Sequence, residues 1–540
     1  MKKIATLHRA CAIALVALMC LASAGRAQEI TSGGLCFHVT DGEELTLEVV
    51  AGPETCTLTS VTVPMRVDYE GRVYLVTGIG DRAFADCQSL TSIALPQSVL
   101  NIGEGAFLRC HALDGVTLPD HLMTLGKWAF SGCTSLQKIS IPVTTQHIGQ
   151  DCFAGCFALE SAVVRSKMRE LPEGMFLNCW ALRDVTLPDL LSIGQACFER
   201  CKALRNIHLP STLRTIGRSA FSGCEALTSI SLPGSLETIG EEAFQGCKGL
   251  GQVTVPASVT TVGYAAFSDC TALQKATLPS ALANLEGWTF NRCSALKKCN
   301  IPTALSALAP AIFNKCTSLE KVVIPSNVKR TGYGVFAGCT SARSIDFGSG
   351  LKVIGDETFF NLDAVKCIGI PENVDSVGRD AFENCSALEE LSLPSQLSTI
   401  APNGFRDCLK LTVVYSSMTT PCDLPDLGFA EATYSAATLY VPENCVNTYK
   451  NRANWKRFSK ILPFDPTRVK ALSDQVAVTV EGKSILVKNA AELTVMVCDA
   501  SGRTYGGEKA TTGDILFATS GCGVYLVTAG TKQWRVLVRE

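Results

Sequence analysis

The sequence predicts an α/β repeat fold: a solenoid of about fifteen 23-residue coils with a cap at each end, followed by a small β-sandwich. Three observations lead to this prediction. A phenylalanine returns at a fixed interval, a short apolar pattern surrounds each phenylalanine, and the pattern changes to alternating strands near the C-terminus. At 540 residues the chain also exceeds what one hydrophobic core usually organises.

Residues 1–27 are predicted to be a secretory signal peptide. A positively charged start, an apolar stretch at residues 11–21 and small residues ending at Ala27 are typical of such a segment, and we predict cleavage after Ala27. A lipoprotein signal built on Cys20 is the alternative, but Met19 precedes that cysteine where a small residue is needed. No other stretch approaches the roughly 20 apolar residues of a transmembrane helix. We therefore expect an extracellular or outer-membrane-surface location, without a transmembrane helix.

A phenylalanine marks each predicted coil. Every step between these residues is 23 except one of 22, from Phe176 to Phe198. The missing residue falls between Pro188 and Ile193, in a predicted turn, where deletions are tolerated best. The fifteen positions are Phe84, Phe107, Phe130, Phe153, Phe176, Phe198, Phe221, Phe244, Phe267, Phe290, Phe313, Phe336, Phe359, Phe382 and Phe405.

The pattern around each phenylalanine predicts the parts of one coil. Phe221 and Cys224 are three residues apart, which predicts one face of a short helical turn. Ile230 and Leu232 are two apart, so they share one face of a short strand, and the proline that follows ends it. Gly217 is predicted to take a positive φ where the chain enters the helical turn. One coil cannot bury both apolar faces alone, so stacked neighbours close the core.

These repeats resemble the BspA-type leucine-rich repeats found on the surface of anaerobic bacteria. The resemblance covers about residues 79–411 and implies a leucine-rich-repeat solenoid there. It departs from the pattern in places: Leu171 and Pro172 stand where Ile and Gly are usual, and Leu362 replaces the cysteine. These departures weaken single coils.

Caps are expected at residues 28–78 and 412–465, because the end coils of a stack must be shielded. Strand-like runs in the N-terminal cap are Leu45–Val50, Val61–Pro64 and Val73–Val76. The C-terminal cap is expected to hold a strand and a set of apolar residues: Thr438–Pro442, then Tyr449, Trp455, Phe458 and Ile461.

Residues 470–540 are predicted to form the β-sandwich. Residues 495–503 and the later Gly523–Val527 resemble the type IX secretion sorting domain of Bacteroidetes, which implies recognition by that secretion machinery. A stalk module without a sorting role is the alternative. The predicted strands are Val476–Val480, Ser484–Val487, Leu493–Cys498 and Val524–Val527.

Fourteen of the 26 cysteines, from Cys87 to Cys408, occupy one repeat position, three residues after the phenylalanine. Their Cβ vectors should point in parallel into the core, which a disulfide cannot accept, so we expect reduced core thiols. Two pairs outside this ladder are better bridge candidates: Cys36 with Cys56, and Cys498 with Cys522.

No catalytic or cofactor motif is found, so an enzyme is not expected. Cys152 and Cys156 form a Cys-x-x-x-Cys pair, as do Cys197 and Cys201, but zinc would need two further ligands. We predict that Cys152 and Cys197 only replace the usual small residue before the phenylalanine. The net charge of −2 also argues against a nucleic-acid partner.

The outward positions of the predicted strands are polar and nearly free of aromatics, which disfavours a glycan ligand and suits a protein partner. We expect an adhesin for host extracellular-matrix or plasma proteins; a structural or self-associating envelope protein is the alternative. The candidate binding residues on this face are Lys138, Arg183, Arg205, His208, Lys275, Lys297, Lys298 and Lys321.

Overall fold

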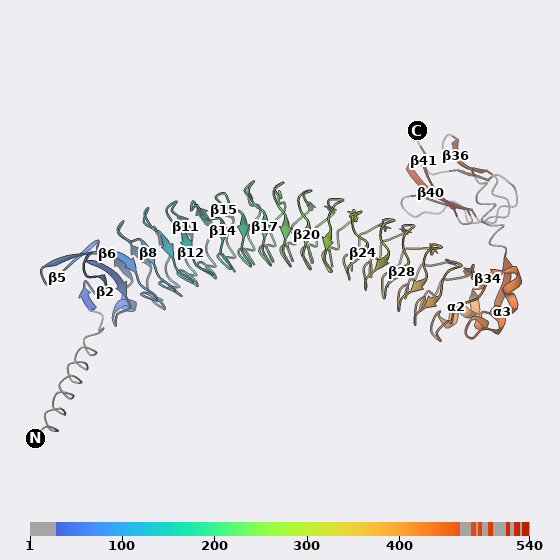
Figure 1. Cartoon of the computed structure of the whole chain (residues 1–540), viewed down its shortest axis with the longest axis horizontal. Helices are drawn as coiled ribbons and strands as arrows, with labels where there is room; N and C mark the ends of the chain where they lie inside the picture. Colours follow the sequence, from blue (N-terminus) through green and yellow to red (C-terminus); the bar gives the residue numbers. More distant parts are fainter. Residues whose placement is uncertain are drawn as a thin grey trace, which may run out of the picture. The chain divides into compact units, whose positions relative to one another are not determined.

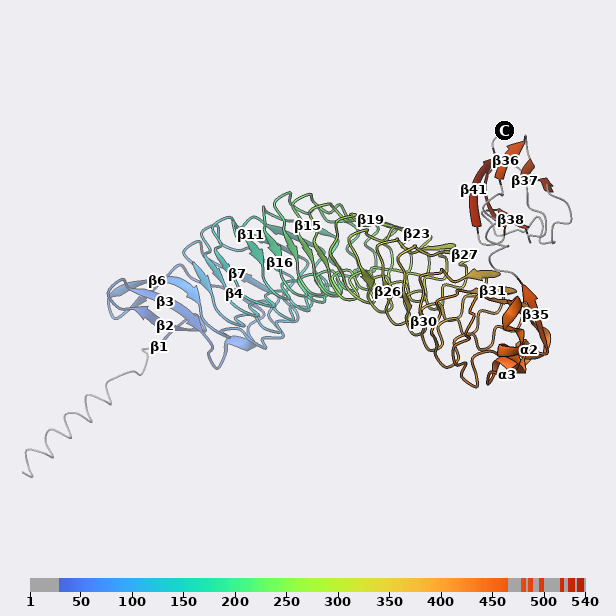
Figure 2. The same ribbon diagram turned by 45° about the vertical axis from the view of Figure 1, so that its right-hand side comes forward.

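The computed structural model divides into two compact units, Met1–Leu213 and Arg214–Glu540. Figure 1 labels strands and helices of both units. In both units the chain winds into short coils that stack on one another (Figure 2). The residues that the structure describes are 29–464, 477–481, 484–488, 495–499, 515–518, 523–529 and 532–538.

The first unit begins with a cap of six strands. Strands β1, β2 and β3 pair antiparallel, and β3 then pairs in parallel with β6, the strand that leads into the first coil. All three strand-like runs expected here form strands. The elements of the cap are β1 (Glu29–Ser32), β2 (Leu35–Asp41), β3 (Thr46–Val50), the 3-10 helix η1 (Thr55–Thr57), β4 (Ser60–Thr62), β5 (Arg66–Tyr69) and β6 (Arg72–Ile79).

Each coil of the first unit carries two short strands, which pair in parallel with the same strands of neighbouring coils. We call the strand before the proline the front strand. The strand before the glycine that stands four residues ahead of the phenylalanine is the back strand. The front strands are β4, β7 (Ser92–Ala94), β9 (Gly115–Val116), β11 (Lys138–Ile141), β13 (Ser161–Val164) and β15 (Asp184–Thr186). The back strands are β6, β8 (Asn101–Ile102), β10 (Thr124–Leu125), β12 (His147–Ile148), β14 (Glu170–Leu171) and β16 (Ser192–Ile193).

The second unit repeats this arrangement. Its front strands are β19 (Gln252–Thr254), β21 (Lys275–Thr277), β23 (Lys298–Cys299), β25 (Lys321–Val323), β27 (Ser344–Asp346), β29 (Cys367–Gly369), β31 (Glu390–Leu393) and β33 (Val413–Ser416). Its back strands are β17 (Thr215–Ile216), β18 (Thr238–Ile239), β20 (Thr261–Val262), β22 (Asn284–Leu285), β24 (Ala307–Leu308), β26 (Arg330–Thr331), β28 (Val353–Ile354), β30 (Ser376–Val377) and β32 (Thr399–Ile400).

The third side of each coil, the phenylalanine segment from the glycine to the cysteine (residues 80–87 in the first coil), is not helical. Arg82 has φ 56° and Asp86 has φ 65°, so a left-handed residue stands two positions before and two after Phe84. The same two positions are left-handed around all fifteen phenylalanines. A right-handed helix cannot contain such residues, so the predicted helical turn is wrong. The fold is a leucine-rich-repeat β-solenoid of about 17 turns with little helix.

Successive phenylalanine segments are joined by a one-directional ladder of hydrogen bonds. The amide of Phe84 donates to the carbonyl of Ala106 at 2.8 Å, and the amide of Arg82 donates to Glu104 at 2.8 Å. In the second unit the amide of Phe244 donates to Ala266 in the same way, also at 2.8 Å. The amides of the left-handed residues and of the phenylalanine between them point to the next coil, while the other amides bond within their own coil, as that of Ala85 does to the Arg82 carbonyl at 3.0 Å. The segment is therefore satisfied without a helix or a strand.

The phenylalanine rings form the centre of the core. Phe84 and Phe107 stack with centroids 5.3 Å apart and an interplanar angle of 3°, and Phe382 and Phe405 repeat this at 5.3 Å and 7°. All of these rings are buried. The expectation that the recurring apolar residues face inward is confirmed.

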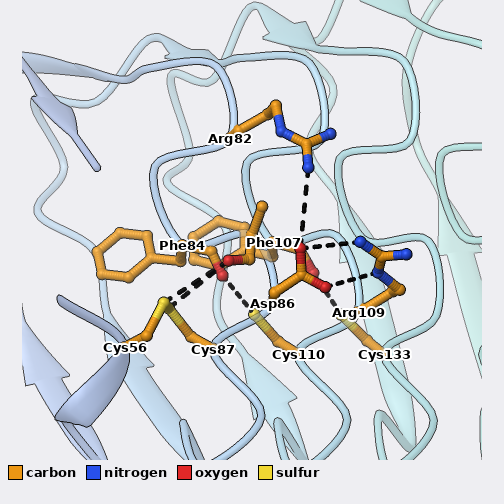
Figure 3. Close-up of polar contacts among 10 residues, drawn as sticks. Cys56, Arg82, Phe84, Asp86, Cys87, Phe107, Arg109, Cys110 and Cys133 are labelled. Carbon is orange, nitrogen blue, oxygen red and sulfur yellow. Dashed lines mark hydrogen bonds and ion pairs between the residues drawn. A yellow bond between two sulfur atoms is a disulfide. The ribbon is translucent and has the colours of Figure 1, made fainter. Parts of the chain in front are cut away.

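Most ladder cysteines contact the coil before their own. The Cys110 thiol donates to the Phe84 carbonyl at 3.0 Å, and Cys133 donates to Phe107 at 3.2 Å (Figure 3). A thiol is a weak donor, but here it also fills a small apolar site. The thirteen ladder cysteines after Cys87 are free thiols, as expected.

The first ladder cysteine departs from that expectation, because Cys87 forms a disulfide with Cys56. Cys36 is a free, buried thiol, so the predicted Cys36–Cys56 bridge is wrong. No coil precedes Cys87. The place of one is taken by η1 of the cap, which brings Cys56 to it with the Cα atoms 4.3 Å apart. The other candidate bridge includes Cys522, which lies outside the described residues.

The glycine before each phenylalanine segment serves close packing and does not adopt a positive φ, contrary to the prediction. A Cβ added at Gly126 would lie 2.4 Å from the carbonyl carbon of Gly103, and one at Gly149 would lie 2.3 Å from the amide nitrogen of Lys127. Gly240 and Gly263 meet the preceding coil in the same manner. Only a residue without a side chain fits where two coils approach this closely.

The second unit closes with strands β34 (Thr438–Pro442) and β35 (Lys460–Phe464), which extend the front sheet from β33. Trp455 is fully buried and its indole N–H donates to the Cys422 carbonyl at 2.8 Å. Tyr449, Phe458 and Ile461 are buried as expected. Four short helices lie here: α2 (Glu431–Ala436), η2 (Glu443–Cys445), α3 (Val446–Asn451) and η3 (Trp455–Arg457).

Beyond residue 476 the described strands are antiparallel, with β36–β37–β39 in one sheet and β38–β40–β41 in another. The four predicted strands are present with shifted ends. Their bounds are β36 (Ala477–Glu481), β37 (Ser484–Lys488), β38 (Val495–Asp499), β39 (Ile515–Ala518), β40 (Gly523–Ala529) and β41 (Lys532–Val538).

Candidate functional site

The front strands present alternate residues to solvent, and the predicted binding residues of the first unit lie there in part. Lys138 begins β11 and is exposed, with Ser161 beside it on β13. Arg183 is exposed immediately before β15. No strand forms over residues 205–209, so Arg205 and His208 are exposed but lie outside the front sheet.

The four predicted residues of the second unit form a lysine patch, defined as Lys275, Lys297, Lys298 and Lys321. Lys275 on β21 stands directly beside Lys298 on β23, and Lys297 is next in the chain. Adjacent parallel strands are about 4.8 Å apart, so these cations are close neighbours. Within the described part of the chain, no carboxylate lies within 4.0 Å of Lys275, Lys297 or Lys298. Lys321, which is half-buried, pairs with Asp346 at 3.4 Å.

Several other charges in both units pair with an opposite charge in a neighbouring coil, at a spacing of 23 residues. Arg109 lies 2.6 Å from Asp86, and this hydrogen bond lowers the pKa of the Asp86 carboxyl (Figure 3). In the second unit Lys366 lies 3.1 Å from Glu389. Three cations of the lysine patch have no such partner.

An open depression of about 410 Å³ lies on the front face of the first unit, where Gly115 carries no side chain. Lys138 is the one predicted site residue beside it. The residues that line it are Ile93, Asp114, Gly115, Val116, Thr117, Gln137 and Lys138.

The thiols of the core are poorly suited to nucleophilic chemistry. Burial raises the pKa of the Cys110 thiol to about 12, and it also raises the pKa of the Cys152 and Cys197 thiols. A nucleophilic cysteine needs a lowered pKa. Among the described residues, no three His, Cys, Asp or Glu side chains are grouped as metal ligands would be.

Aromatic residues at the corners of the coils were not predicted from the sequence as candidate site residues. Phe157 and Trp180 stack at 4.2 Å in successive coils of the first unit, and the Lys202 ammonium lies 5.2 Å from the Trp180 ring centre. Trp128 and Trp288 occupy another corner, two residues before a phenylalanine. Their regular positions in the repeat are the sequence signal that could have identified them.

Comparison with known families decides which kind of solenoid this is. The family model described as "BspA type Leucine rich repeat region" matches residues 77–203, 191–320 and 306–421. The chain belongs to the BspA-type leucine-rich repeat family. Proteins with these repeats are at the cell surface or secreted, and the solenoid is a non-enzymatic scaffold for protein interaction. No helix of the described residues has the length and apolar character needed to cross a bilayer.

One solved structure agrees with this assignment. A leucine-rich repeat protein from Bacteroides ovatus is 25% identical, with a TM-score of 0.52, and the match covers 72% of this chain and 94% of that one. A leucine rich cell surface protein from Faecalibacterium prausnitzii is 24% identical over 73% of this BspA-type chain and 96% of its own, with a TM-score of 0.36. No curated protein matches the sequence.

Proposed function

We propose that this BspA-type protein is an exported adhesin that binds acidic regions of host extracellular-matrix or plasma proteins through the lysine patch. The observation that supports this is the group of three lysines without a carboxylate partner, Lys275 on β21, Lys298 on β23 and Lys297 immediately before β23. A partner carboxylate that approaches a lysine already in an ion pair must compete with that pair. An unpaired lysine instead gains attraction when a carboxylate of the partner approaches.

Export is part of the proposal. The signal peptide at residues 1–27 would direct the chain across the inner membrane, and residues 470–540 would act as a type IX sorting domain. The antiparallel strands β36 to β41 are compatible with a small sandwich of this kind.

The test is binding of the mature chain to immobilised matrix and plasma proteins. The double variant Lys297→Glu with Lys298→Glu should weaken binding at least about tenfold, since two attractions become repulsions. Lys329→Glu with Lys352→Glu is the matched control, because it changes the charge equally at exposed positions next to the back strands of the same unit. Added salt should weaken wild-type binding as well.

Saturable binding that only the first double variant loses would support the adhesin. Equal loss in both variants, or no saturable binding to any host protein, would overturn it. Concentration-dependent light scattering of the chain alone would in the latter case favour the self-associating envelope protein.

A further inference from the structure

Two tryptophans of the first unit, the half-buried Trp128 and the exposed Trp180, are covered by lysines of the chain itself. The Lys127 ammonium lies 4.0 Å above the Trp128 ring, and the Trp128 indole N–H donates to Asp151 Oδ2 at 3.2 Å. Trp180 has Lys202 at 5.2 Å from one face and Phe157 stacked on it. Each ring thus has a cation over its face.

Trp288 of the second unit occupies the same repeat position as Trp128, and its φ of 62° is close to the 57° of Trp128. Its surroundings differ at both contacts. Gly287 stands where Lys127 stands, and Ala311 stands where Asp151 stands. Across the described ranges, no cation lies over the Trp288 ring and no acceptor meets its indole N–H, and the side chain is 36% exposed.

The neighbourhood of Trp288 is apolar and acidic. Tyr264 in the coil before is 42% exposed, and Pro310, whose carbonyl accepts the Trp288 amide at 2.9 Å, is exposed in the coil after. Glu286 is exposed beside them, and one of its carboxylate oxygens accepts the Tyr264 amide at 2.9 Å.

We propose that Tyr264, Glu286, Trp288 and Pro310 form a second binding site, which takes a lysine or arginine side chain from an extended segment of a partner protein. The partner cation takes the place that Lys127 holds over Trp128, and Glu286 supplies the opposite charge. A main-chain carbonyl of the segment takes the place of Asp151 at the indole N–H. Tyr264 and Pro310 contact the aliphatic part of the side chain and its neighbours. The site is separate from the lysine patch, and its charge preference is the reverse.

The test uses a fluorescein-labelled hexalysine peptide, with hexaserine as the uncharged reference, in an anisotropy titration of the mature chain at about 0.15 M salt. Trp288→Ala should raise the Kd at least about fivefold and Glu286→Gln about threefold. Trp288→Phe should restore part of the affinity, because it keeps an aromatic face. Trp128→Ala, the matched control, should change the Kd less than about twofold, since Lys127 already covers that ring.

Two results would overturn the site. One is hexalysine binding to Trp288→Ala as tightly as to the wild type; the other is hexalysine binding no better than hexaserine. A neutral oligosaccharide that binds through Trp288 while hexalysine does not would also count against it. Unfolding midpoints of the Trp288 and Glu286 variants should match that of the wild type, because these two side chains are exposed. The Lys297→Glu, Lys298→Glu variant should retain hexalysine binding, which separates this site from the adhesin proposal.

Discussion

Gly126 and Gly115 lie eleven residues apart in the first unit, yet their surroundings differ completely. A Cβ at Gly126 would lie 2.4 Å from Gly103 and 2.5 Å from the Glu104 amide nitrogen, all of it backbone. A Cβ at Gly115 would have no atom within 4 Å. The first glycine permits two coils to approach, and the second only leaves the front-face depression open.

Gly126→Ala should therefore lower the free energy of unfolding by about 1–3 kcal/mol, because the preceding coil must shift. Gly115→Ala is the control and should stay within about 0.5 kcal/mol of the wild type. Urea unfolding of both variants would measure this. Equal midpoints for the two variants would contradict the close-packing explanation.

At the residue scale the sequence predicted which side chains are buried, but not always why a residue is needed. Periodicity alone shows that Phe221 and Leu227 point inward. It does not show that the Cys247 thiol donates to the Phe221 carbonyl at 3.2 Å, because that carbonyl belongs to the coil before. Likewise, the Cys56–Cys87 bridge depends on where the cap places η1, which no repeat spacing reveals.

The phenylalanine segment is the element that the sequence analysis described wrongly. The spacing of Phe221 and Cys224 fits a helical turn, but left-handed residues at both sides exclude it. A signal for this was present. The position two after the phenylalanine is Gly, Asn or Asp in eleven of the fifteen coils, and these residues tolerate a left-handed backbone best. The position two before it is too varied to carry such a signal.

Ala265, with φ 53°, tests the left-handed conformation directly. Ala265→Val should lower the free energy of unfolding by about 2 kcal/mol, because a β-branched residue strongly disfavours positive φ. Ala265→Gly should be neutral or stabilising by up to about 1 kcal/mol. Thermal unfolding would rank the two. Val tolerated as well as Gly would show that this position is not left-handed.

The disulfide makes a prediction for the N-terminal cap. A peptide map without reduction should contain Cys56 joined to Cys87 and Cys36 as a free thiol. Cys56→Ser should lower the stability of the cap by about 2–4 kcal/mol, since the bridge closes a loop of 31 residues in the unfolded chain. Faster proteolysis within residues 29–79, with the later coils unaffected, would reveal it. A map that joins Cys36 to Cys56 would contradict the assignment.

For the whole molecule, the buried thiols link stability to alkaline pH. Burial raises the pKa of Cys110 and of Cys339 to about 12 from an ordinary value of 9.0, and that of Cys422 to about 11. Below pH 9 these thiols are protonated in both states and contribute no pH dependence. Above it the unfolded chain releases protons that the folded chain retains, so the free energy of unfolding should fall between about pH 9 and 12.

Urea midpoints at pH 8, 9 and 10.5 would measure this fall. Cys247→Ala with Cys270→Ala removes two buried thiols and should give a shallower slope, while the tyrosine and lysine titrations remain the same in both proteins. Identical slopes would show that the thiols do not cause the loss of stability.

The architecture at this scale follows from the sequence most directly. A period that recurs fifteen times predicts a stack of coils, since no single coil can bury its own apolar residues. The two proposed binding sites do not follow so directly. Outward residues are polar whether or not they bind, and the unpaired lysines and the uncovered Trp288 became visible only when their neighbours in adjacent coils were placed beside them.

The one-directional ladder of the phenylalanine segments has a consequence for the two ends of the array. The amides of the left-handed residues and of the phenylalanine face the C-terminal neighbour. The opening coil therefore offers carbonyls outward, while the closing coil offers N–H groups, such as that of Phe405, which the cap accepts through Gly428 at 3.0 Å. The caps are therefore not interchangeable. Without caps, the closing coil of one array would pair its N–H groups with the carbonyls of another array's opening coil, and a filament would grow. Two opening coils, or two closing coils, would meet with unpaired groups of the same kind. The caps cover both ends.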